Sequence, residues 1–206
     1  MRVAMIGSGN VGQALGRGLR AAGHEVTFSA AHPERAEAAA AEVGGQAASS
    51  NAEAARDADV IILAMPFTAG ESVAHDIAPS VGGKAVVDVT NTGAGTVSEL
   101  APGADSAAEA FAQWLPDAHV VKAFNTAFAA RMASPMQDGT PLDGFVAGDD
   151  EAAKAAVMAL VADIGFAPLD GGPLANAAML EGMAMLNIWL NANHGWGWTS
   201  AWRLAR

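Results

Sequence analysis

Residues 1–35 read MRVAMIGSGNVGQALGRGLRAAGHEVTFSAAHPER, and this stretch decides the fold. The apolar run over 3–6 predicts a strand, the alanine- and leucine-rich run over 11–22 predicts a helix, and 25–28 predicts a second strand. The turn between the first strand and the helix, residues 7–12, has the spacing G-x-G-x-x-G. A strand, a glycine-rich turn, a helix and a second strand in this order are typical of a dinucleotide-binding unit.

The three glycines of this turn each meet a separate physical requirement. Gly7 allows a tight turn, Gly9 lets the backbone approach a pyrophosphate, and Gly12 lets the helix pack closely on the strand. The free amides and the positive dipole end of the helix then attract the anion. An ordinary turn could use glycine for geometry alone, but the flanking strand and helix favour the binding role. We therefore expect the pyrophosphate of a nicotinamide dinucleotide to contact Gly7, Ser8, Gly9, Asn10, Val11 and Gly12.

The rest of the chain continues the alternation of short apolar runs and alanine-rich helical runs. Expected strands cover 60–63, 85–89, 120–123, 144–147 and 166–168, and expected helices cover 33–43, 68–78, 107–114 and 151–164. Strands that are apolar throughout indicate a sheet covered on both faces. The sequence therefore predicts an α/β fold, a Rossmann-type doubly wound, mostly parallel sheet with a small C-terminal helical part.

The pattern changes near residue 171. Residues 174–194 predict one long helix with almost no polar face, which must be buried in its own chain or against a partner. We expect a Rossmann domain over 1–170 and a C-terminal helical segment for substrate binding or dimerisation over 171–206. The segment 134–144, which has two prolines and two glycines, is the expected exposed loop.

Composition narrows the function classes. The net charge of −11 disfavours nucleic-acid and anionic-membrane partners. The chain has no cysteine and only five scattered histidines, which disfavours thiolate chemistry and a metal site. The N-terminus does not resemble a signal peptide, and no apolar run is long enough to span a membrane. We expect a cytoplasmic protein.

The tip of the second strand bears on the choice of dinucleotide. An NAD enzyme usually has an acid there to bind the ribose hydroxyls, and this chain has Ser29-Ala30-Ala31 instead. Ser29, His32 and Arg35 suit the 2'-phosphate of NADP better, because a guanidinium forms paired hydrogen bonds with phosphate. Arg35 could instead be a solvated helix charge. NADP is therefore the expected cofactor, and NAD is the alternative.

Ligands of an open parallel sheet lie across the carboxyl ends of its strands. The residues expected there are Ala64, Met65, Pro66, Asn91, Asn125, Thr126 and Ala127. The amides and hydroxyl in this set can hydrogen-bond a ribose or carboxamide, or could simply cap turns.

General acids near that edge are scarce. Lys122 and His119 are the candidates, and Lys122 is expected to lie inside a strand and to pair with a carboxylate such as Asp88. Hydride transfer between stacked rings needs proximity and orientation more than acid–base help. We assign no catalytic residue.

Five segments together resemble a known family: VAMIGSGNVGQALGRGLRAAGHEV, DADVIILAMPF, VVKAFNT, VAGDDEAAKAAVMAL and GFAPLDGGPLANAAMLEGMAMLNIWL. They resemble the NADP-dependent reductases of the deazaflavin coenzyme F420, which are related to the cytosolic reductase domain of six-transmembrane ferric reductases. The resemblance implies a homodimer, a flavin-like ring stacked on the nicotinamide, and hydride transfer at the pro-S face. It also implies that Met65-Pro66 and residues 125–129 lie near the nicotinamide.

Two positions depart from the family pattern. Ala30-Ala31 replaces the Ser-Arg pair that contacts the 2'-phosphate, and Asn125 stands where deazaflavin reductases often have His. The expected function is an oxidoreductase that transfers hydride between NADP(H) and a deazaflavin or flavin. The alternatives are a reductase of a small imine or carbonyl compound and a non-enzymatic NADP(H)-binding redox sensor.

Four of the five tryptophans lie in the last eighteen residues, at positions 189, 196, 198 and 202. They could form a wall for a flat ring, or they could belong to a dimer or domain interface, where tryptophan is enriched. Both interpretations hold if the site lies at the dimer interface. We expect a homodimer formed through the C-terminal helix.

Overall fold

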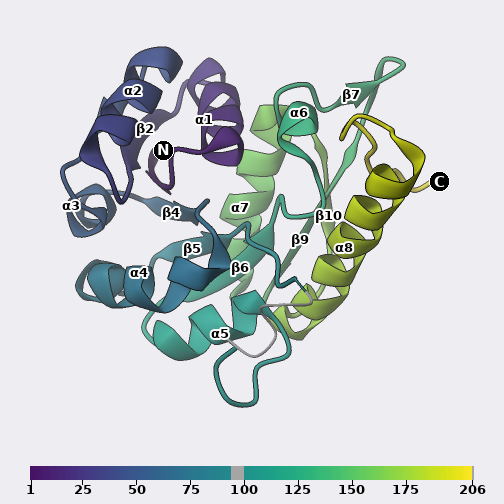
Figure 1. Cartoon of the computed structure of the whole chain (residues 1–206). Helices are drawn as coiled ribbons and strands as arrows, with labels where there is room; N and C mark the ends of the chain where they lie inside the picture. The colour runs from purple at the N-terminus through teal and green to yellow at the C-terminus, as the bar shows by residue number, and fades with distance from the viewer. Residues whose placement is uncertain (94–99, 206) are drawn as a thin grey trace.

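The computed structural model describes residues 1–93 and 100–205, and its centre is an eight-stranded sheet (Figure 1). The strand order is β10-β9-β6-β5-β4-β1-β2-β3. The sheet strands are β1 (Arg2–Ile6), β2 (Glu25–Ser29), β3 (Gln46–Ala47), β4 (Val60–Leu63), β5 (Ala85–Asp88), β6 (His119–Ala123), β9 (Asp143–Gly148) and β10 (Ala167–Asp170). All neighbours pair in parallel except β6 and β9. The predicted doubly wound, mostly parallel sheet is confirmed.

Helices cover both faces of this sheet. They are α1 (Asn10–Ala21), α2 (Pro33–Val43), α3 (Asn51–Arg56), α4 (Gly70–Ile77), α5 (Ala107–Trp114), α6 (Ala129–Met132), α7 (Glu151–Ile164) and α8 (Ala177–His194), with 3-10 turns η1 (Phe67–Ala69), η2 (Ala78–Ser80) and η4 (Leu174–Asn176). One core cluster lies under α1, α2 and α7, and the other lies under α3, α4 and α5. Alternate residues of β1 enter opposite clusters, Val3 and Met5 one and Ala4 and Ile6 the other. This alternation explains why the strands are apolar throughout.

The antiparallel step between β6 and β9 follows from the short connection that joins them. Residues 124–142 contain only the four-residue helix α6 and a small hairpin of β7 (Met136–Gln137) and β8 (Thr140–Pro141). This segment stays at the edge where β6 ends, so β9 starts there and runs back, with Ala123 opposite Val146. The expected loop over 134–144 therefore includes a hairpin, most of which is exposed.

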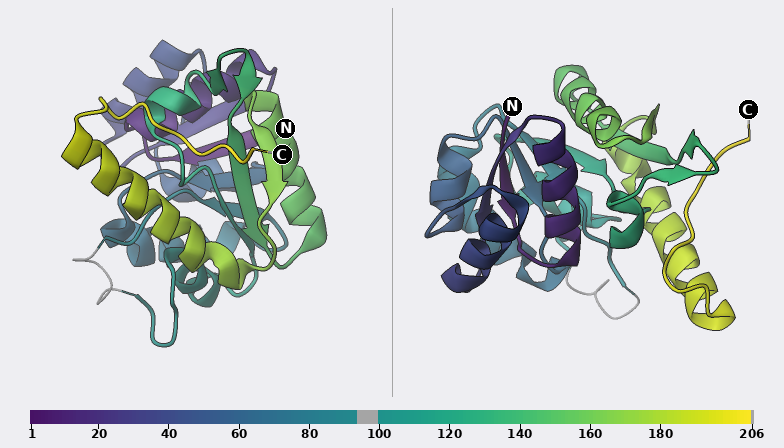
Figure 2. Two further views of the ribbon diagram at one scale, coloured as in Figure 1. Left: turned by 90° about the vertical axis from the view of Figure 1, so that its right-hand side faces the viewer. Right: turned by 90° about the horizontal axis from the view of Figure 1, so that it is seen from above.

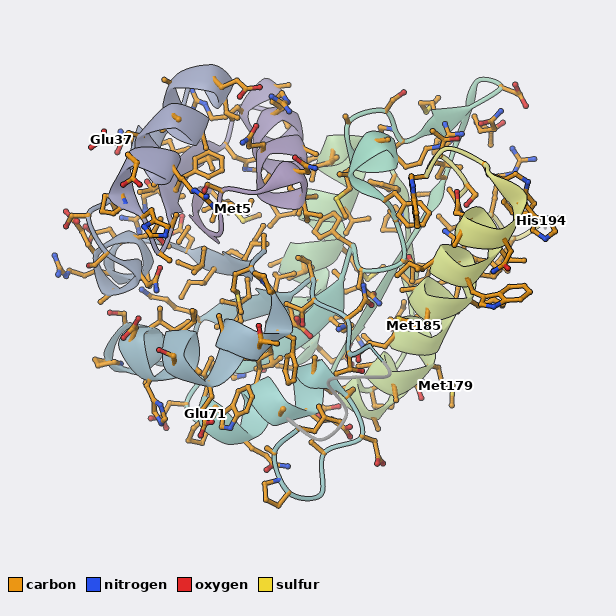
Figure 3. All side chains as sticks on the ribbon, in the orientation of Figure 1. Met5, Glu37, Glu71, Met179, Met185 and His194 are labelled. Atoms are coloured by element: carbon orange, nitrogen blue, oxygen red, sulfur yellow. The ribbon has the colours of Figure 1, made fainter. Side chains whose placement is uncertain are left out.

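Helix α8 runs along the edge of the molecule opposite α2 and α3 (Figures 1 and 2). Its polar residues Glu181, Asn187 and Asn191 are buried, whereas Met179 and Trp189 are 69% and 58% exposed. Figure 3 shows Met179 on the outward side of the helix. The expectation of a helix without a polar face is thus corrected: the polar face points inward. In the described part of the chain, no helix has the length and apolar character needed to cross a bilayer.

Candidate functional site

The glycine-rich turn between β1 and α1 has the geometry that its spacing predicts. Gly7 has φ of 121°, and a Cβ there would lie 2.3 Å from the carbonyl oxygen of Ala64. A Cβ on Gly12 would lie 2.2 Å from the carbonyl oxygen of Gly7. A Cβ on Gly9 would meet no atom within 4 Å, and Gly9 is the N-cap of α1, with no side-chain cap. The protein itself requires Gly7 and Gly12, while the space beside Gly9 is open to a ligand.

A cavity of about 500 Å³ lies over this turn. Eight of the predicted site residues line it: Gly7, Ser8, Gly9, His32, Arg35, Ala64, Met65 and Pro66. The lining also includes Ala30 and Ala31, which stand where the family has its 2'-phosphate contacts. The sequence had not indicated the other lining residues, which are Ile6, Asn51, Ala69, Ser72, Val73 and Asp76. The volume falls in the range of small-molecule sites. The cavity combines small apolar walls with a basic rim at the end of β2.

Ser29 lies beneath this cavity rather than on its surface. Its side chain is buried, and its hydroxyl donates to Asn51 Oδ1 at 2.8 Å. Asn51 Nδ2 in turn donates to Asp76 Oδ2 at 3.1 Å. The tip of β2 is therefore tied to α3 and α4, and the carboxylate of Asp76 enters the cavity from α4.

A second cavity of about 150 Å³ lies between the carboxyl ends of β5 and β6 and helix α8. Five predicted site residues line it: Val11, Asn91, Asn125, Thr126 and Ala127. The other lining residues are Val89, Phe128, Ala129, Met132, Ala184, Asn187 and Ile188. Val11 belongs to the first turn of α1, so the two cavities flank the glycine-rich turn. Asn10, which is exposed, and Gly12, which is buried, line neither cavity.

Two asparagines join the ends of β5 and β6. Asn125 Nδ2 donates to Asn91 Oδ1 at 2.9 Å, and Asn91 Nδ2 donates to the carbonyl oxygen of Asn125 at 3.2 Å. Phe124, just before this pair, has φ of 63°, which is rare and strained for a bulky residue. Its buried ring packs edge-on against Phe166 at 6.4 Å. The core thus holds the strained backbone that presents Asn125 to the cavity.

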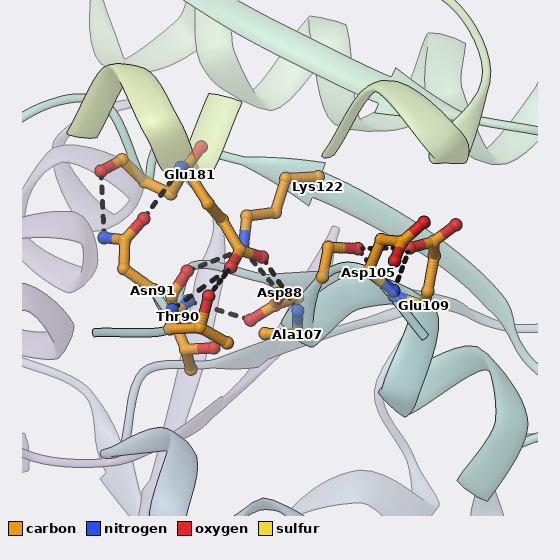
Figure 4. Close-up of polar contacts among 11 residues, drawn as sticks. Asp88, Thr90, Asn91, Asp105, Ala107, Glu109, Lys122 and Glu181 are labelled. Carbon is orange, nitrogen blue, oxygen red and sulfur yellow. Dashed lines mark hydrogen bonds and ion pairs between the residues drawn. The ribbon is translucent and has the colours of Figure 1, made fainter. Parts of the chain in front are cut away.

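A buried ion network lies directly behind these asparagines (Figure 4). The Lys122 ammonium is fully buried and lies 2.8 Å from Asp88 Oδ2 and 2.8 Å from Glu181 Oε1. It also donates to the carbonyl oxygen of Thr90 at 2.6 Å. The pairing of Lys122 with Asp88 is confirmed, and Glu181 of α8 is an additional partner.

The carboxylate of Glu181 joins α8 to two other segments. Glu181 Oε2 accepts hydrogen bonds from the Thr92 hydroxyl at 2.5 Å and from its backbone amide at 3.1 Å. Glu181 Oε1 accepts from the Ala107 amide at the start of α5 at 2.9 Å. Lys122 and Glu181 therefore hold the residues on both sides of Asn91 in place.

Neither candidate acid is available to a ligand in the second cavity. Lys122 already forms ion pairs with Asp88 and Glu181. His119 lies at the opposite end of β6, 3.7 Å from Asp150. Among the described residues, none that lines the second cavity is titratable. The cavity can orient and enclose a ring, and its own side chains supply no proton.

The comparisons with known proteins agree with this geometry. A family model described as "NADP oxidoreductase coenzyme F420-dependent" matches residues 2–92. The F420-dependent NADP reductase of Methanothermobacter marburgensis is 30% identical over 208 residues, which cover 93% of this chain and 92% of that protein. This chain belongs to the F420-dependent NADP reductase family. The predicted resemblance and the predicted oxidoreductase class are confirmed.

Other family relatives and structural neighbours extend this picture. Metalloreductase STEAP3 of Rattus norvegicus is 31% identical over 89% of this chain, but the chain covers only 36% of that protein. The crystal structure of a putative F420-dependent NADP reductase from Arthrobacter sp. FB24 has a TM-score of 0.86 at 27% identity, over 100% of both chains. An imine reductase of Streptomyces aurantiacus, at 21% identity and a TM-score of 0.70, shares the fold.

The C-terminal aromatics of this family member divide into two groups. Trp198 packs edge-on against Phe128, which lines the second cavity, with ring centroids 5.5 Å apart. Trp196 stacks on His194 at 5.0 Å, and both of these side chains are exposed. Trp198 and Trp196 are 49% and 47% exposed, and they differ in that Trp198 also packs on the wall of the second cavity.

Sequence reasoning missed several residues that surround the two cavities. Asn51 follows Ser50, whose side chain accepts from the amide of Glu53, so the S-x-x-E pattern could have revealed a helix start there. Asp76 and Asn187 lie on helices and carry no local signal for a cavity. Their positions depend on how α4 and α8 pack.

Proposed function

We propose that this protein transfers hydride between NADP(H), bound across the glycine-rich turn, and a deazaflavin or flavin-type ring. The observation that carries the proposal is the arrangement of two cavities on either side of that turn. None of the described residues that line the second cavity is titratable. The bound dinucleotide would supply or accept the hydride at its nicotinamide ring. The protein binds and orients the two rings.

The first cavity fits the adenosine and pyrophosphate part of a dinucleotide. The open space at Gly9 and the free amides of α1 suit the pyrophosphate. Arg35 and His32, both exposed on the rim, suit a 2'-phosphate, and no acid stands at the tip of β2. The relative from Methanothermobacter marburgensis is named for NADP, which supports the same choice.

The second cavity supports the choice of a ring acceptor over an imine or carbonyl. Reduction of an imine or carbonyl needs a proton at the reacting atom, and the described lining offers no acid. A flavin-type ring that accepts a hydride needs one proton as well, and it can take that proton from solvent at an exposed edge. The names of the methanogen relatives point to a deazaflavin as the acceptor.

We propose that a second copy of this chain covers the outer face of α8. Met179, Leu186 and Trp189 are 69%, 49% and 58% exposed and lie along one side of the helix. A row of apolar residues on one helix is self-complementary, as a two-fold interface requires. Residues 1–170 would then form the dinucleotide-binding domain and residues 171–206 the substrate and dimerisation segment.

An acceptor panel tests the proposed function. The protein is incubated with NADPH and, in turn, an oxidised deazaflavin, FMN, FAD and a cyclic imine, while the loss of nicotinamide absorbance is followed. Turnover with ring acceptors and none with the imine is the expected result. Turnover with the imine alone refutes the ring acceptor, and tight NADPH binding without turnover indicates the sensor instead.

A further inference from the structure

Two buried asparagines that line the second cavity each have one side-chain atom without a hydrogen-bond partner in the described part of the chain. The atoms are Asn125 Oδ1 and Asn187 Nδ2, on side chains only 5% and 4% exposed. They come from different elements, the end of β6 and the middle of α8. Buried polar groups are nearly always paired, so two such atoms beside one cavity indicate a ligand.

The hydrogen-bond network fixes which atom of Asn125 is free. The side chain of Asn91 faces the carbonyl oxygen of Asn125, and only an NH₂ group can donate to it, so Asn91 Nδ2 must point there. Asn91 Oδ1 is then left to accept from Asn125 Nδ2. The remaining atom of Asn125 is Oδ1, which is an acceptor.

The same logic fixes the free atom of Asn187. Asn191 Nδ2 donates to the backbone carbonyl of Asn187 at 2.9 Å, which orients the Asn191 amide. The same NH₂ group also donates to the Ser200 hydroxyl oxygen and lies 3.2 Å from Asn187 Oδ1. Because Ser200 accepts from Asn191, its own hydrogen is left to donate to Asn187 Oδ1 at 2.5 Å. The remaining atom of Asn187 is Nδ2, which is a donor.

We infer that Asn125 and Asn187 together recognise an amide edge, a ring substituent or ring edge in which a C=O lies next to an N–H. The ligand N–H donates to Asn125 Oδ1, and the ligand C=O accepts from Asn187 Nδ2. The rest of the described lining is apolar apart from Asn91 and Thr126. A cavity of about 150 Å³ holds one benzene-sized ring.

This inference rests on the proposed function and makes Asn187 a specificity residue contributed by the C-terminal helix. Two sources can provide the amide edge within the proposed reaction. One is the carboxamide of the nicotinamide, and the other is the pyrimidinedione edge of a flavin-type acceptor. The chemistry is shared, and the experiment below separates the two sources.

The test variant is Asn187→Asp, which keeps the oxygen that Ser200 and Asn191 contact and replaces the free donor with an acceptor that carries a negative charge. The matched control is Asn193→Asp, the same change on an exposed position of the same helix. Two quantities are measured for each: the Kd of NADP and of adenosine 2',5'-bisphosphate without acceptor, and the KM of FMN and of the deazaflavin at saturating NADPH.

Loss of one buried hydrogen bond should change the affected constant by about tenfold or more. If the nicotinamide is the source, Asn187→Asp weakens NADP and leaves adenosine 2',5'-bisphosphate unchanged. If the acceptor is the source, NADP binding is unchanged and the KM of the acceptor rises. If Asn187→Asp matches Asn193→Asp in every constant, or weakens adenosine 2',5'-bisphosphate as much as NADP, the inference is overturned.

A ligand-side measurement on the unmodified protein keeps the test valid if Asn187→Asp does not fold. The 3-acetylpyridine analogue of NADP and N3-methylated FMN each keep the C=O and lack the N–H. At least one of them should bind about tenfold more weakly than its parent compound. Equal binding of both pairs refutes the amide edge. Failure of the proposed function is distinct, because it shows in the unmodified protein as an absence of turnover with every ring acceptor, whatever the binding constants are.

Discussion

Replacement of Lys122 by methionine should destabilise this protein more than any other lysine substitution among the described residues. Methionine has a similar length, so the change removes the charge and leaves little empty space. The variant loses the contacts of the ammonium with Asp88, Glu181 and the Thr90 carbonyl, all at 2.6–2.8 Å. Two buried carboxylates then face each other without a cation.

The size of the stability loss expected for Lys122→Met follows from the burial of its ion pairs. Removing one partner of a buried ion pair costs about 3–5 kcal/mol, because the remaining charge is left uncompensated. Lys154 provides the matched control, since it also contacts two carboxylates, Glu151 and Asp170. Those carboxylates are 83% and 50% exposed, so solvent screens them and Lys154→Met should cost much less than Lys122→Met.

Urea unfolding followed by tryptophan fluorescence measures both variants. The free energy of unfolding should fall by the amounts above with an unchanged dependence on urea concentration, which shows that the unfolded states are comparable. A loss for Lys122→Met no larger than that for Lys154→Met would refute the reasoning. The network would then not be what joins α8 to the sheet.

Four further predictions concern binding, assembly and pH. Gly9→Val should lower the unfolding temperature only slightly, since a Cβ there meets no protein atom within 4 Å and Gly9 provides no side-chain cap. It should weaken NADPH by about a hundredfold or more by blocking the pyrophosphate, measured by titration. Arg35→Ala should weaken NADPH about tenfold or more and NADH little; equal effects would exclude the 2'-phosphate contact. Trp189→Glu should convert a dimer into a monomer in light scattering, and an unchanged mass would place the interface elsewhere. The hydrogen bonds from Arg2 hold the pKa of Asp59 below its ordinary value, so their stabilisation is present at neutral pH and is lost as the pH falls through that lowered pKa. Asp59→Asn should remove this pH-dependent contribution to the free energy of unfolding. If the free energy of unfolding falls by the same amount between pH 7 and acid pH in the variant and in the unmodified protein, the prediction is contradicted.

Much of the dinucleotide half could be predicted from the sequence because its requirements are local. Gly12 is required by a close contact with the Gly7 carbonyl, and Gly7 by its positive φ in the turn, so both requirements lie within one strand–turn–helix unit and their spacing carries the information. The two helices over 107–114 and 151–164 have the predicted bounds, since capping residues and apolar periodicity are also local.

The second cavity could not be predicted to the same extent because it is assembled from distant segments. Glu181 and Asn187 look like interruptions of an apolar helix in the sequence, and only the packing of α8 on β5 and β6 shows that they point inward. The reversal of β9 is another non-local outcome, because an apolar run carries no information on strand direction. The sequence suggests that the Ser29 hydroxyl could contact the cofactor, but in the folded chain this hydroxyl donates to Asn51.

The central claim is direct hydride transfer between NADP(H) and a ring acceptor. The most direct test uses NADPH that carries deuterium at the pro-S position of C4, an oxidised deazaflavin as acceptor, and mass spectrometry of the reduced product. One deuterium is expected on the ring of the product, and none is expected when the label is at the pro-R position. Reduced deazaflavin without deuterium, or no reduction by a protein that binds NADPH, would contradict it.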